Sequence, residues 1–519
     1  MLQQLLVIAA VAAADRTTSV AVHCVQRTCT TVSSGSHLWT AKATYNESVE
    51  RLGWGMLEVF SNAAASDEDQ AFAAGYAESM VTFQRTLDHH KTFMEATFKG
   101  DNHSHSLAID FVTKNDAYVR DQTAATNGTS EWWRQLGLIW TQLDGLVAGH
   151  ASAGGQLTTL DFLLMNAVVD LSSVIHKPFA SAAQWTEESA KEYTRKTTHC
   201  SALVKLLPDY SDLLTAHNTW TDYYMMLRAA KKYVLPYKRA AAASFVTSGY
   251  FGTLSSTDDF SVLSSGLVVQ ETTNALYNAT LAGKIVPEAV LTWARSLVAN
   301  RLATNAREWT EFFVIENSGT INNQWMVVDY NLFVPYKELP PNTLWIVEQL
   351  PLYTQAADVT SYLVDGHWPS YNRPFFPEVF QRSGAAAMAA KFGDRYSYQL
   401  YARAKIFRRD AGGVHDREAM KRIMRYNDWQ HDPYSLGDPE NAIASRADLD
   451  AKGRKCCVGG NIDAKLAGRT DVRALRFEGI SGPTHETQPV FAWTPDDATP
   501  HYGQPERFAF DWELLFGQE

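Results

Sequence analysis

The sequence predicts an α+β fold in which β-sheets lie between layers of helices. Helical spacing of apolar residues dominates the first 199 residues, and short, nearly continuous apolar runs follow. Such runs are expected for strands that are covered on both faces. The two kinds of element do not alternate regularly, which argues against a doubly wound sheet or a TIM barrel.

The N-terminal part is expected to be mostly helical. Apolar side chains recur every three or four residues over 67–99, 131–148 and 159–175, as on one face of a helix. One short strand is expected before these helices, over 53–59. In the first helical stretch the spacing is carried by Phe72, Tyr76, Met80 and Phe83.

Beyond residue 200 the pattern changes to short strands. Two are expected at 200–206 and 210–216, joined by a Pro-Asp turn. A helix is expected over 221–234, and the chain from about 408 onward is rich in loop-forming residues. Further strands are expected at 266–270, 324–329, 344–348 and 404–407.

Composition limits the class of protein. The 519 residues are 45% hydrophobic and 12% aromatic, which is ample for a large core and unlike a disordered chain. At this length the chain forms either two lobes or one large layered domain. The net charge is −11, with acidic and basic residues interspersed. No basic stripe offers a phosphate footprint, so nucleic acid is not an expected partner.

The N-terminus indicates the secretory route. Residues 1–14 form an apolar run that ends in three alanines, as in a signal peptide, although a short N-terminal helix is the alternative. No other stretch reaches the length needed to span a bilayer. We therefore expect a lysosomal or secreted protein without an integral membrane span. Four glycosylation sequons agree with this, at Asn46, Asn102, Asn127 and Asn278.

Five cysteines leave one thiol over after pairing. Cys24 and Cys29 are close enough to close a small loop. Cys456 and Cys457 are adjacent, and a bond between them would strain the preferred disulfide geometry. Cross-pairing between the two sets stays open, and Cys200 is the candidate for the reduced thiol.

The familiar hydrolase motifs are absent from the sequence. There is no Gly-x-Ser-x-Gly nucleophile elbow and no His-Glu-x-x-His zinc motif. The paired histidines at 89–90 and 103–105 are interpreted as a helix end and a surface loop. No metal and no cofactor are expected.

Cys200 can act in two chemical roles or in none. A papain-like nucleophile would need a local Cys-Gly-x-Cys-Trp signature, which is absent. Cleavage between His199 and Cys200 would instead place an α-amine beside the thiol on one residue. That amine, with an ordinary pKa of about 8, could take the thiol proton. The alternative is a buried structural cysteine.

Several stretches carry a family resemblance. They are 198–205 around Cys200, 212–214, 217–220, 53–58, 70–76, 317–325, 344–349, 368–372, 403–410, 432–435, 460–465 and 481–485. From about residue 40 to the C-terminus the chain resembles the phospholipase B-like family of N-terminal-nucleophile hydrolases. The family's additional C-terminal cysteines are missing at 439–444 and 489–493, so its disulfide pattern is not carried over.

The resemblance implies an αββα four-layer sandwich and self-cleavage before Cys200. The products would be two associated chains, 15–199 and 200–519, that form one catalytic domain. Cys200 is then the nucleophile, and His217 polarises the site or holds the amine. Asn372 is the expected oxyanion donor and Arg403 the expected partner of a carboxylate or phosphate. Trp220, Thr273 and Asn274 are expected to contact substrate.

Three functions remain open at this point. The first is release of fatty acyl groups from phospholipids or lysophospholipids. The second is an amidase that acts on N-acyl amides or small peptides. The third is a glycoprotein that binds lipid or protein without turnover. The oligomeric state is also left open.

Overall fold

The computed structural model describes residues 16–33, 35–126, 128–256, 260–364, 366–450 and 459–517. The expected leader (1–14), the sequon at Asn127, and Cys456 with Cys457 lie outside the described residues. Within them the chain combines two large sheets with many helices, so the predicted α+β class is confirmed.

The larger sheet has eleven strands within the described part of the chain. All neighbours in it are antiparallel except one pair, β4 and β7, which run parallel and sit near its middle. In spatial order the strands are β13 (Tyr353–Asp358), β12 (Leu344–Leu350), β11 (Asn323–Asp329), β10 (Leu267–Thr273), β9 (Phe260–Leu263), β8 (Ser244–Gly249), β7 (Arg228–Val234), β4 (Trp54–Ser61), β3 (Ala41–Glu47), β1 (Arg16–Val25) and β2 (Thr28–Val32).

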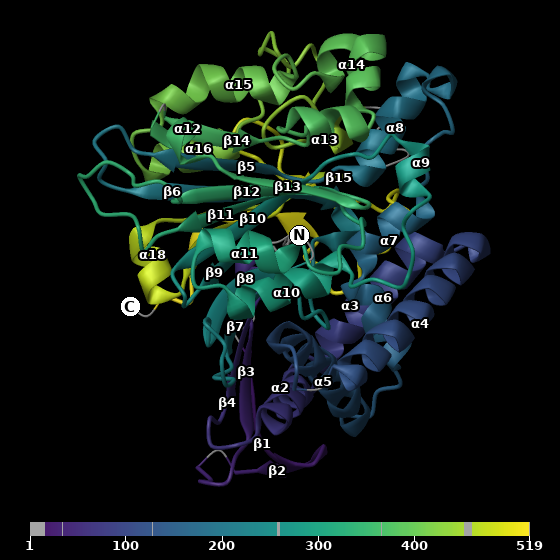
Figure 1. Ribbon diagram of the computed structural model, residues 1–519, viewed down its shortest axis with the longest axis vertical. Coiled ribbons are helices and arrows are strands. Elements are labelled where there is room, and N and C mark those ends of the chain that lie inside the picture. Colours follow the sequence, from purple (N-terminus) through teal and green to yellow (C-terminus); the bar gives the residue numbers. More distant parts are fainter. Residues whose placement is uncertain are drawn as a thin grey trace, which may run out of the picture.

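A second sheet packs face to face against the first, over its strands from β4 to β12. Its six described strands are, in order, β14 (His367–Ser370), β5 (Ser201–Leu206), β6 (Leu213–Asp222), β15 (Gly459–Ala467), β16 (Phe477–Ser481) and β19 (Glu513–Leu515). Ala202 and Val204 of β5 share one buried cluster with Val268 of β10 and Met326 of β11. The two sheets lie one above the other in Figure 1. A small sheet pairs β17 (Phe491–Ala492) with β18 (Arg507–Phe508).

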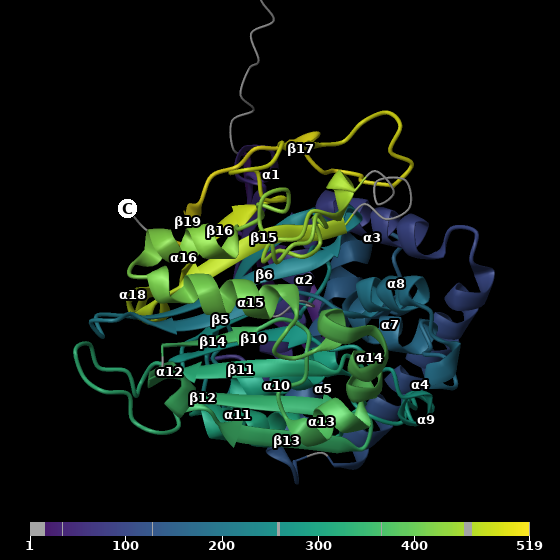
Figure 2. The same cartoon turned by 90° about the horizontal axis from the view of Figure 1, so that it is seen from above.

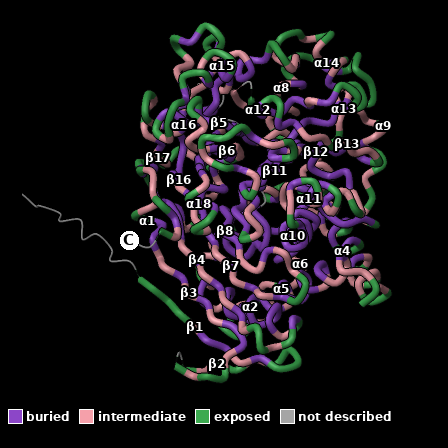
Figure 3. Tube along the Cα trace, turned by 60° about the vertical axis from the view of Figure 1, so that its left-hand side comes forward, coloured by how far each residue is buried: buried purple, intermediate pink, exposed green. Residues whose placement is uncertain are grey.

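Helices cover the outer faces of both sheets (Figures 1 and 2). They are α1 (Val49–Leu52), α2 (Asp67–Val81), α3 (Phe83–Phe98), α4 (Asn102–Ala125), α5 (Glu131–Ser152), α6 (Thr159–Asn166), α7 (Val168–Ile175), α8 (Glu187–Thr197), α9 (Ala279–Ala282), α10 (Thr292–Leu302), α11 (Ala306–Phe313), α12 (Thr360–Val364), α13 (Pro377–Arg382), α14 (Ala385–Phe392), α15 (Ala402–Asp410), α16 (Arg417–Met424) and α18 (Arg469–Ala474). Helices α15 and α16 share a core with β5 and β6, while α2 and α11 share another with the larger sheet. Strands β5, β6, β8 and β11 lie in the buried interior (Figure 3).

Small residues bring α2 and α5 into backbone contact. A Cβ atom on Gly75 would lie 1.9 Å from the carbonyl oxygen of Gln142, and one on Gly145 would lie 2.1 Å from that of Phe72. Side chains larger than hydrogen would therefore push the two helices apart. This close approach explains why α2 is rich in alanine and glycine.

The predicted helices over 67–99, 131–148 and 159–175 are confirmed, and so are the strands over 53–59, 200–206 and 266–270. The helix over 221–234 is wrong, because its second half is β7, held between β4 and β8 in the sheet. Tertiary pairing here overrides helix-forming alanines and lysines.

Three further elements differ from the prediction. The strand over 404–407 is wrong, because these residues belong to α15, whose alanines and basic residues favour helix. Strands β1, β2 and β3 precede the helices and were not expected. Strand β15, in a stretch interpreted as loop, was also missed. Its buried residues include Asp463 and Lys465, which form an ion pair with an Nζ–Oδ1 distance of 2.6 Å and interrupt the apolar run.

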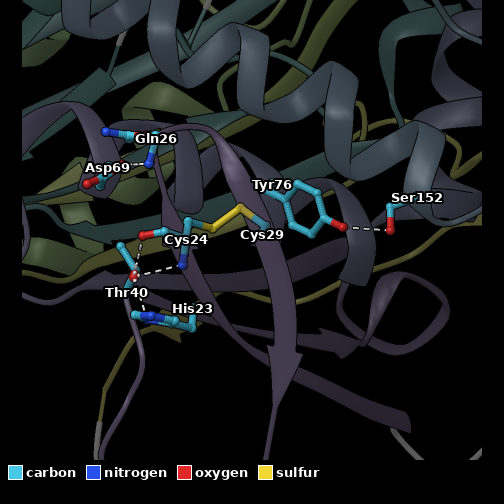
Figure 4. The surroundings of a disulfide bond; sticks show 8 residues. All are labelled: His23, Cys24, Gln26, Cys29, Thr40, Asp69, Tyr76 and Ser152. Atoms are coloured by element: carbon cyan, nitrogen blue, oxygen red, sulfur yellow. Dashed lines mark hydrogen bonds between the residues drawn. A yellow bond between two sulfur atoms is a disulfide. The ribbon is translucent and has the colours of Figure 1, made fainter.

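The small loop expected between Cys24 and Cys29 is confirmed as a disulfide. The two residues face each other across the β1–β2 hairpin. The backbone N–H of Cys24 also donates to Thr40 Oγ1 over 2.9 Å, which ties the hairpin to the chain before β3 (Figure 4).

Candidate active site

Cys200 lies in the short connection between the end of α8 and the start of β5. Its side chain is a fully buried thiol. Its backbone has a φ of +81°, a left-handed conformation that is costly for a residue with a Cβ atom. One such strained residue therefore lies directly at the His199–Cys200 peptide bond.

The carbonyl group of His199 lies in a cradle of two donors. The backbone N–H of Thr273 donates to it over 3.0 Å. The side-chain Nδ2 of Asn372 donates to the same oxygen and also to the carbonyl of Thr273 over 2.7 Å. Two N–H groups aimed at one carbonyl oxygen are the arrangement that stabilises an oxyanion when a nucleophile attacks the carbon.

Arg403 holds this cradle in place from α15. Its guanidinium donates to the carbonyl of Cys200 over 2.7 Å, to Ser201 Oγ over 2.9 Å, and to Oδ1 of Asn372. It also lies over the ring of Trp220, 4.0 Å from the centroid. Burial lowers the pKa of Arg403 from its usual value, but a guanidinium stays protonated. These contacts direct the charge of Arg403 toward the chain's own carbonyls and fix the orientation of the Asn372 amide.

Glu271 is the site residue that sequence reasoning missed. Its Oε1 lies 3.8 Å from Cys200 Sγ, close enough to accept the thiol hydrogen. Its Oε2 accepts from Thr273 Oγ1 over 3.2 Å and from Asn323 Nδ2 over 2.5 Å. One sequence signal could have found it, since it is the only ionisable residue in the fully buried strand β10.

His217 lies on β6, next to the nucleophile. Its Nε2 is 2.8 Å from the backbone carbonyl oxygen of Glu271. Atoms of Cys200, His217 and Glu271 lie within 4.8 Å of one another. A thiophilic divalent ion would meet three suitable ligands there, one from each residue, and its binding would displace the hydrogen of the thiol.

The expected substrate contacts separate into two groups. Thr273 and Trp220 lie at the site through the contacts given above. The side chain of Asn274 lies beside the buried carboxyl group of Glu348 on β12, and its backbone N–H donates to the carbonyl of Asn322. The structure thus brings together Cys200, His217, Asn372, Arg403, Trp220 and Thr273, and directs the Asn274 side chain elsewhere.

A cleft of about 1260 Å³ opens beside this site. His199, Trp220 and Arg403 form part of its wall. Helix α8 forms another part of the wall. Two ion pairs hold this helix in place, with Lys191 Nζ 3.0 Å from Asp438 and Arg195 2.5 Å from Glu440. The segment that ends at His199 therefore occupies one side of the entrance.

The described sequons differ in accessibility. Asn102 is exposed at the start of α4. Asn278 caps α9, and its Nδ2 donates to the carbonyl of Arg382. Asn46 lies in β3 with a buried Oδ1. Among the three, Asn102 offers the most open amide.

Comparison with known proteins places the chain in a family. The model of the Phospholipase B family matches residues 41–515. The chain belongs to the phospholipase B-like family. It is 39% identical to bovine "Phospholipase B-like 1" over 90% of this chain and 86% of the relative. It is 38% identical to "Phospholipase B-like protein B" of Dictyostelium discoideum, over 91% and 85% of the two chains. "Phospholipase B" of Crotalus adamanteus is 36% identical over 91% and 87%.

Membership of this family makes the chain a relative of phospholipase-type hydrolases. The matched residues include every predicted site residue, the whole smaller sheet, and the larger sheet except β1 and β2. None of the helices in the described part of the chain is long and apolar enough to cross a bilayer.

Proposed function

We propose that this protein is an N-terminal-nucleophile cysteine hydrolase that activates itself by cleavage between His199 and Cys200. The observation that carries the proposal is the two-donor cradle on the His199 carbonyl, directly before a buried thiol. A peptide carbonyl polarised in this way is arranged for attack. The layered packing of the two sheets and their covering helices is, on this proposal, the αββα sandwich of such hydrolases.

The self-cleavage step needs a base that is not the α-amine. Before cleavage the nitrogen of Cys200 is part of a peptide bond and cannot take a proton. Glu271 accepts the thiol proton instead, and the thiolate attacks the His199 carbonyl carbon. The oxyanion is held by Thr273 N–H and Asn372 Nδ2. Glu271 then returns the proton to the Cys200 nitrogen as the C–N bond breaks, which leaves a thioester.

Water hydrolyses the thioester and completes the cut. The products are the chains 15–199 and 200–519. Their association is supported by the parallel pairing of β4 with β7 across the cut and by the buried ion pair of Glu78 with Lys231 at 2.8 Å. The two chains would share one core.

In the mature enzyme the released amine of Cys200 becomes the base. The thiolate attacks an acyl carbonyl that occupies the former place of the His199 carbonyl, and the same two donors stabilise the oxyanion. Relatives named as phospholipases B favour an acyl ester of a phospholipid or lysophospholipid as substrate. The lysosomal or secreted location is supported by the Cys24–Cys29 disulfide, since disulfides persist in oxidising compartments.

An amidase that acts on N-acyl amides is the second candidate. The observation in its favour is that the cradle holds an amide carbonyl, that of the His199–Cys200 bond itself. Rates of release from matched acyl ester and acyl amide substrates separate the two functions. A Cys200→Ala protein should cleave neither substrate. If the wild type forms no acyl-thioester on Cys200 with either substrate, the chain is a non-catalytic binding protein instead.

A further inference from the structure

Three buried side chains around the nucleophile form a set of ligands suited to zinc. One ligand atom each from Cys200, His217 and Glu271 lies within 4.8 Å of the other two. Within the described part of the chain, this is the one group of three or more cysteine, histidine or carboxylate side chains that gathers so closely. Zinc binds thiolate, imidazole and carboxylate together, whereas magnesium and calcium take oxygen ligands.

The spacing of the three ligand atoms fits a zinc ion. In a tetrahedral site the Zn–S bond is about 2.3 Å and the Zn–O bond about 2.1 Å, which places sulfur and oxygen about 3.6 Å apart. Cys200 Sγ and Glu271 Oε1 are 3.8 Å apart. No pair in the set exceeds 4.8 Å, so side-chain shifts of about 1 Å would close the three ligands around an ion.

Hydrogen bonds to the backbone and to neighbouring side chains orient two of these ligands. Nε2 of His217 lies 2.8 Å from the backbone carbonyl oxygen of Glu271. That oxygen can only accept, so Nε2 carries the ring hydrogen and Nδ1 carries the lone pair of the neutral imidazole. Oε2 of Glu271 accepts from Thr273 and Asn323, while Oε1 is the oxygen near the thiol. Ligands of protein-bound zinc are held by second hydrogen bonds of this kind.

A small cavity gives an ion access to the ligands. Its volume is about 110 Å³, Glu271 lies in its wall, and it shares Trp220 with the large cleft. Its other walls mix apolar side chains with polar ones, among them Ser172, Thr219 and Thr273. A polar cavity can hold ordered water. Water from this cavity can therefore supply the fourth zinc ligand that three protein side chains leave open.

Resting on the proposed function, we propose that the uncut chain binds one zinc ion through Cys200, His217 and Glu271, and that this ion suppresses self-cleavage. Binding replaces the S–H bond by a Zn–S bond, the thiol proton passes to water, and no electron is transferred. The ion then holds the sulfur electron pair that would attack the His199 carbonyl carbon. It also occupies the carboxylate of Glu271, which can no longer take the thiol proton. Removing the ion with a chelator reverses both effects.

The kinetic test follows self-cleavage of the slowly cleaving Asn372→Ala chain by intact mass, with and without zinc. Zinc at ten times the dissociation constant measured by equilibrium dialysis leaves about one chain in eleven without the ion. Cleavage should therefore slow about tenfold. Excess chelator should restore the rate, and magnesium at the same concentration should leave it unchanged. A rate that zinc does not change overturns the inference.

Two histidine variants in the same background locate the site. His217→Gln removes one ligand, so the same fractional slowing, relative to its own zinc-free rate, should need at least about tenfold more zinc. His89→Gln is the matched control, because buried His89 also bonds a backbone carbonyl, that of Phe251 over 2.7 Å, and lines neither cavity. It should keep the original zinc response. Equal zinc sensitivity of the two variants would assign the effect to another part of the chain.

Cobalt(II) in place of zinc separates failure of the metal site from failure of the proposed function, because its binding is seen without any cleavage. A thiolate ligand gives cobalt a charge-transfer band in the near ultraviolet. The band should appear with Asn372→Ala and be lost when Cys200→Ala is added, a difference to which Cys456 and Cys457 do not contribute. A Cys200-dependent band in a chain that never cuts itself would keep the metal site and refute self-cleavage. Cleavage with the same spectrum in both proteins would keep self-cleavage and refute the metal site.

Discussion

Replacing Asn372 by alanine removes one of the two donors to the His199 carbonyl and leaves the other, the N–H of Thr273. Loss of one oxyanion donor slows acyl transfer about 100- to 1000-fold, which corresponds to about 3–4 kcal/mol of transition-state stabilisation. The Asn372→Ala protein should therefore be purified largely as a single chain and should then cleave slowly with first-order kinetics. The assay is a time course of intact mass for the two products.

Asn372 also accepts a hydrogen bond from buried Arg403, so its loss carries a structural effect of about 1–3 kcal/mol. Asn115→Ala is the matched control, because buried Asn115 donates to two carbonyls, of Pro287 and Ala289, and lines neither cavity at the site. It should lower stability by a similar amount and cleave at the wild-type rate. Cleavage of Asn372→Ala at the wild-type rate, or equal slowing by Asn115→Ala, would refute the oxyanion role.

Three further predictions concern other parts of the molecule. Glu271→Gln should slow self-cleavage at least about 100-fold, because the amide cannot take the thiol proton; wild-type kinetics by intact mass would exclude Glu271 as the base. Burial raises the pKa of Glu348 from 4.5 to about 7, so its contribution is complete below pH 4.5 and is lost as the pH rises through 7. Chemical denaturation should show about 3 kcal/mol less stability at pH 8 than at pH 4.5, and Glu348→Gln should remove this loss. If the variant lost as much stability as the wild type between these two pH values, Glu348 would not be its cause. Replacing Cys24 and Cys29 by alanine should lower stability by about 2 kcal/mol, measured by thermal unfolding; an unaltered Tm would show that the hairpin is not coupled to the core.

Much of the fold could be predicted because its strands are unusually apolar. Strands β10, β11 and β12 are buried on both faces, and the apolar runs at 267–269, 325–328 and 344–347 mark them in the sequence. Strands β7 and β15 could not be found in this way. Each of these strands carries a charged side chain that points into the space between the two sheets. There Arg228 of β7 pairs with Asp463 of β15 over 2.8 Å. In the sequence of either strand alone, a charged residue of a buried ion pair cannot be told from a charged residue on the surface.

The site residues that lie in family motifs, such as Cys200 and Asn372, could be predicted from the sequence. Glu271, which only folding brings to the site, was missed. Cys200 and Asn372 meet because β14 pairs with β5, which brings residue 372 next to residue 200. Glu271 joins them from the other sheet, across the interface between the sheets. The lone ionisable residue of a buried strand marks Glu271 in the sequence, but no local signal reports its contact with Cys200.

The most direct test of the account is the N-terminal sequence of the purified mature protein, together with the intact mass of each chain. The account predicts a chain that begins at Cys200 in the wild type and a single uncut chain in Cys200→Ala. A folded wild-type protein that contains no chain beginning at Cys200 would contradict self-cleavage, and with it the role proposed for the cradle around His199.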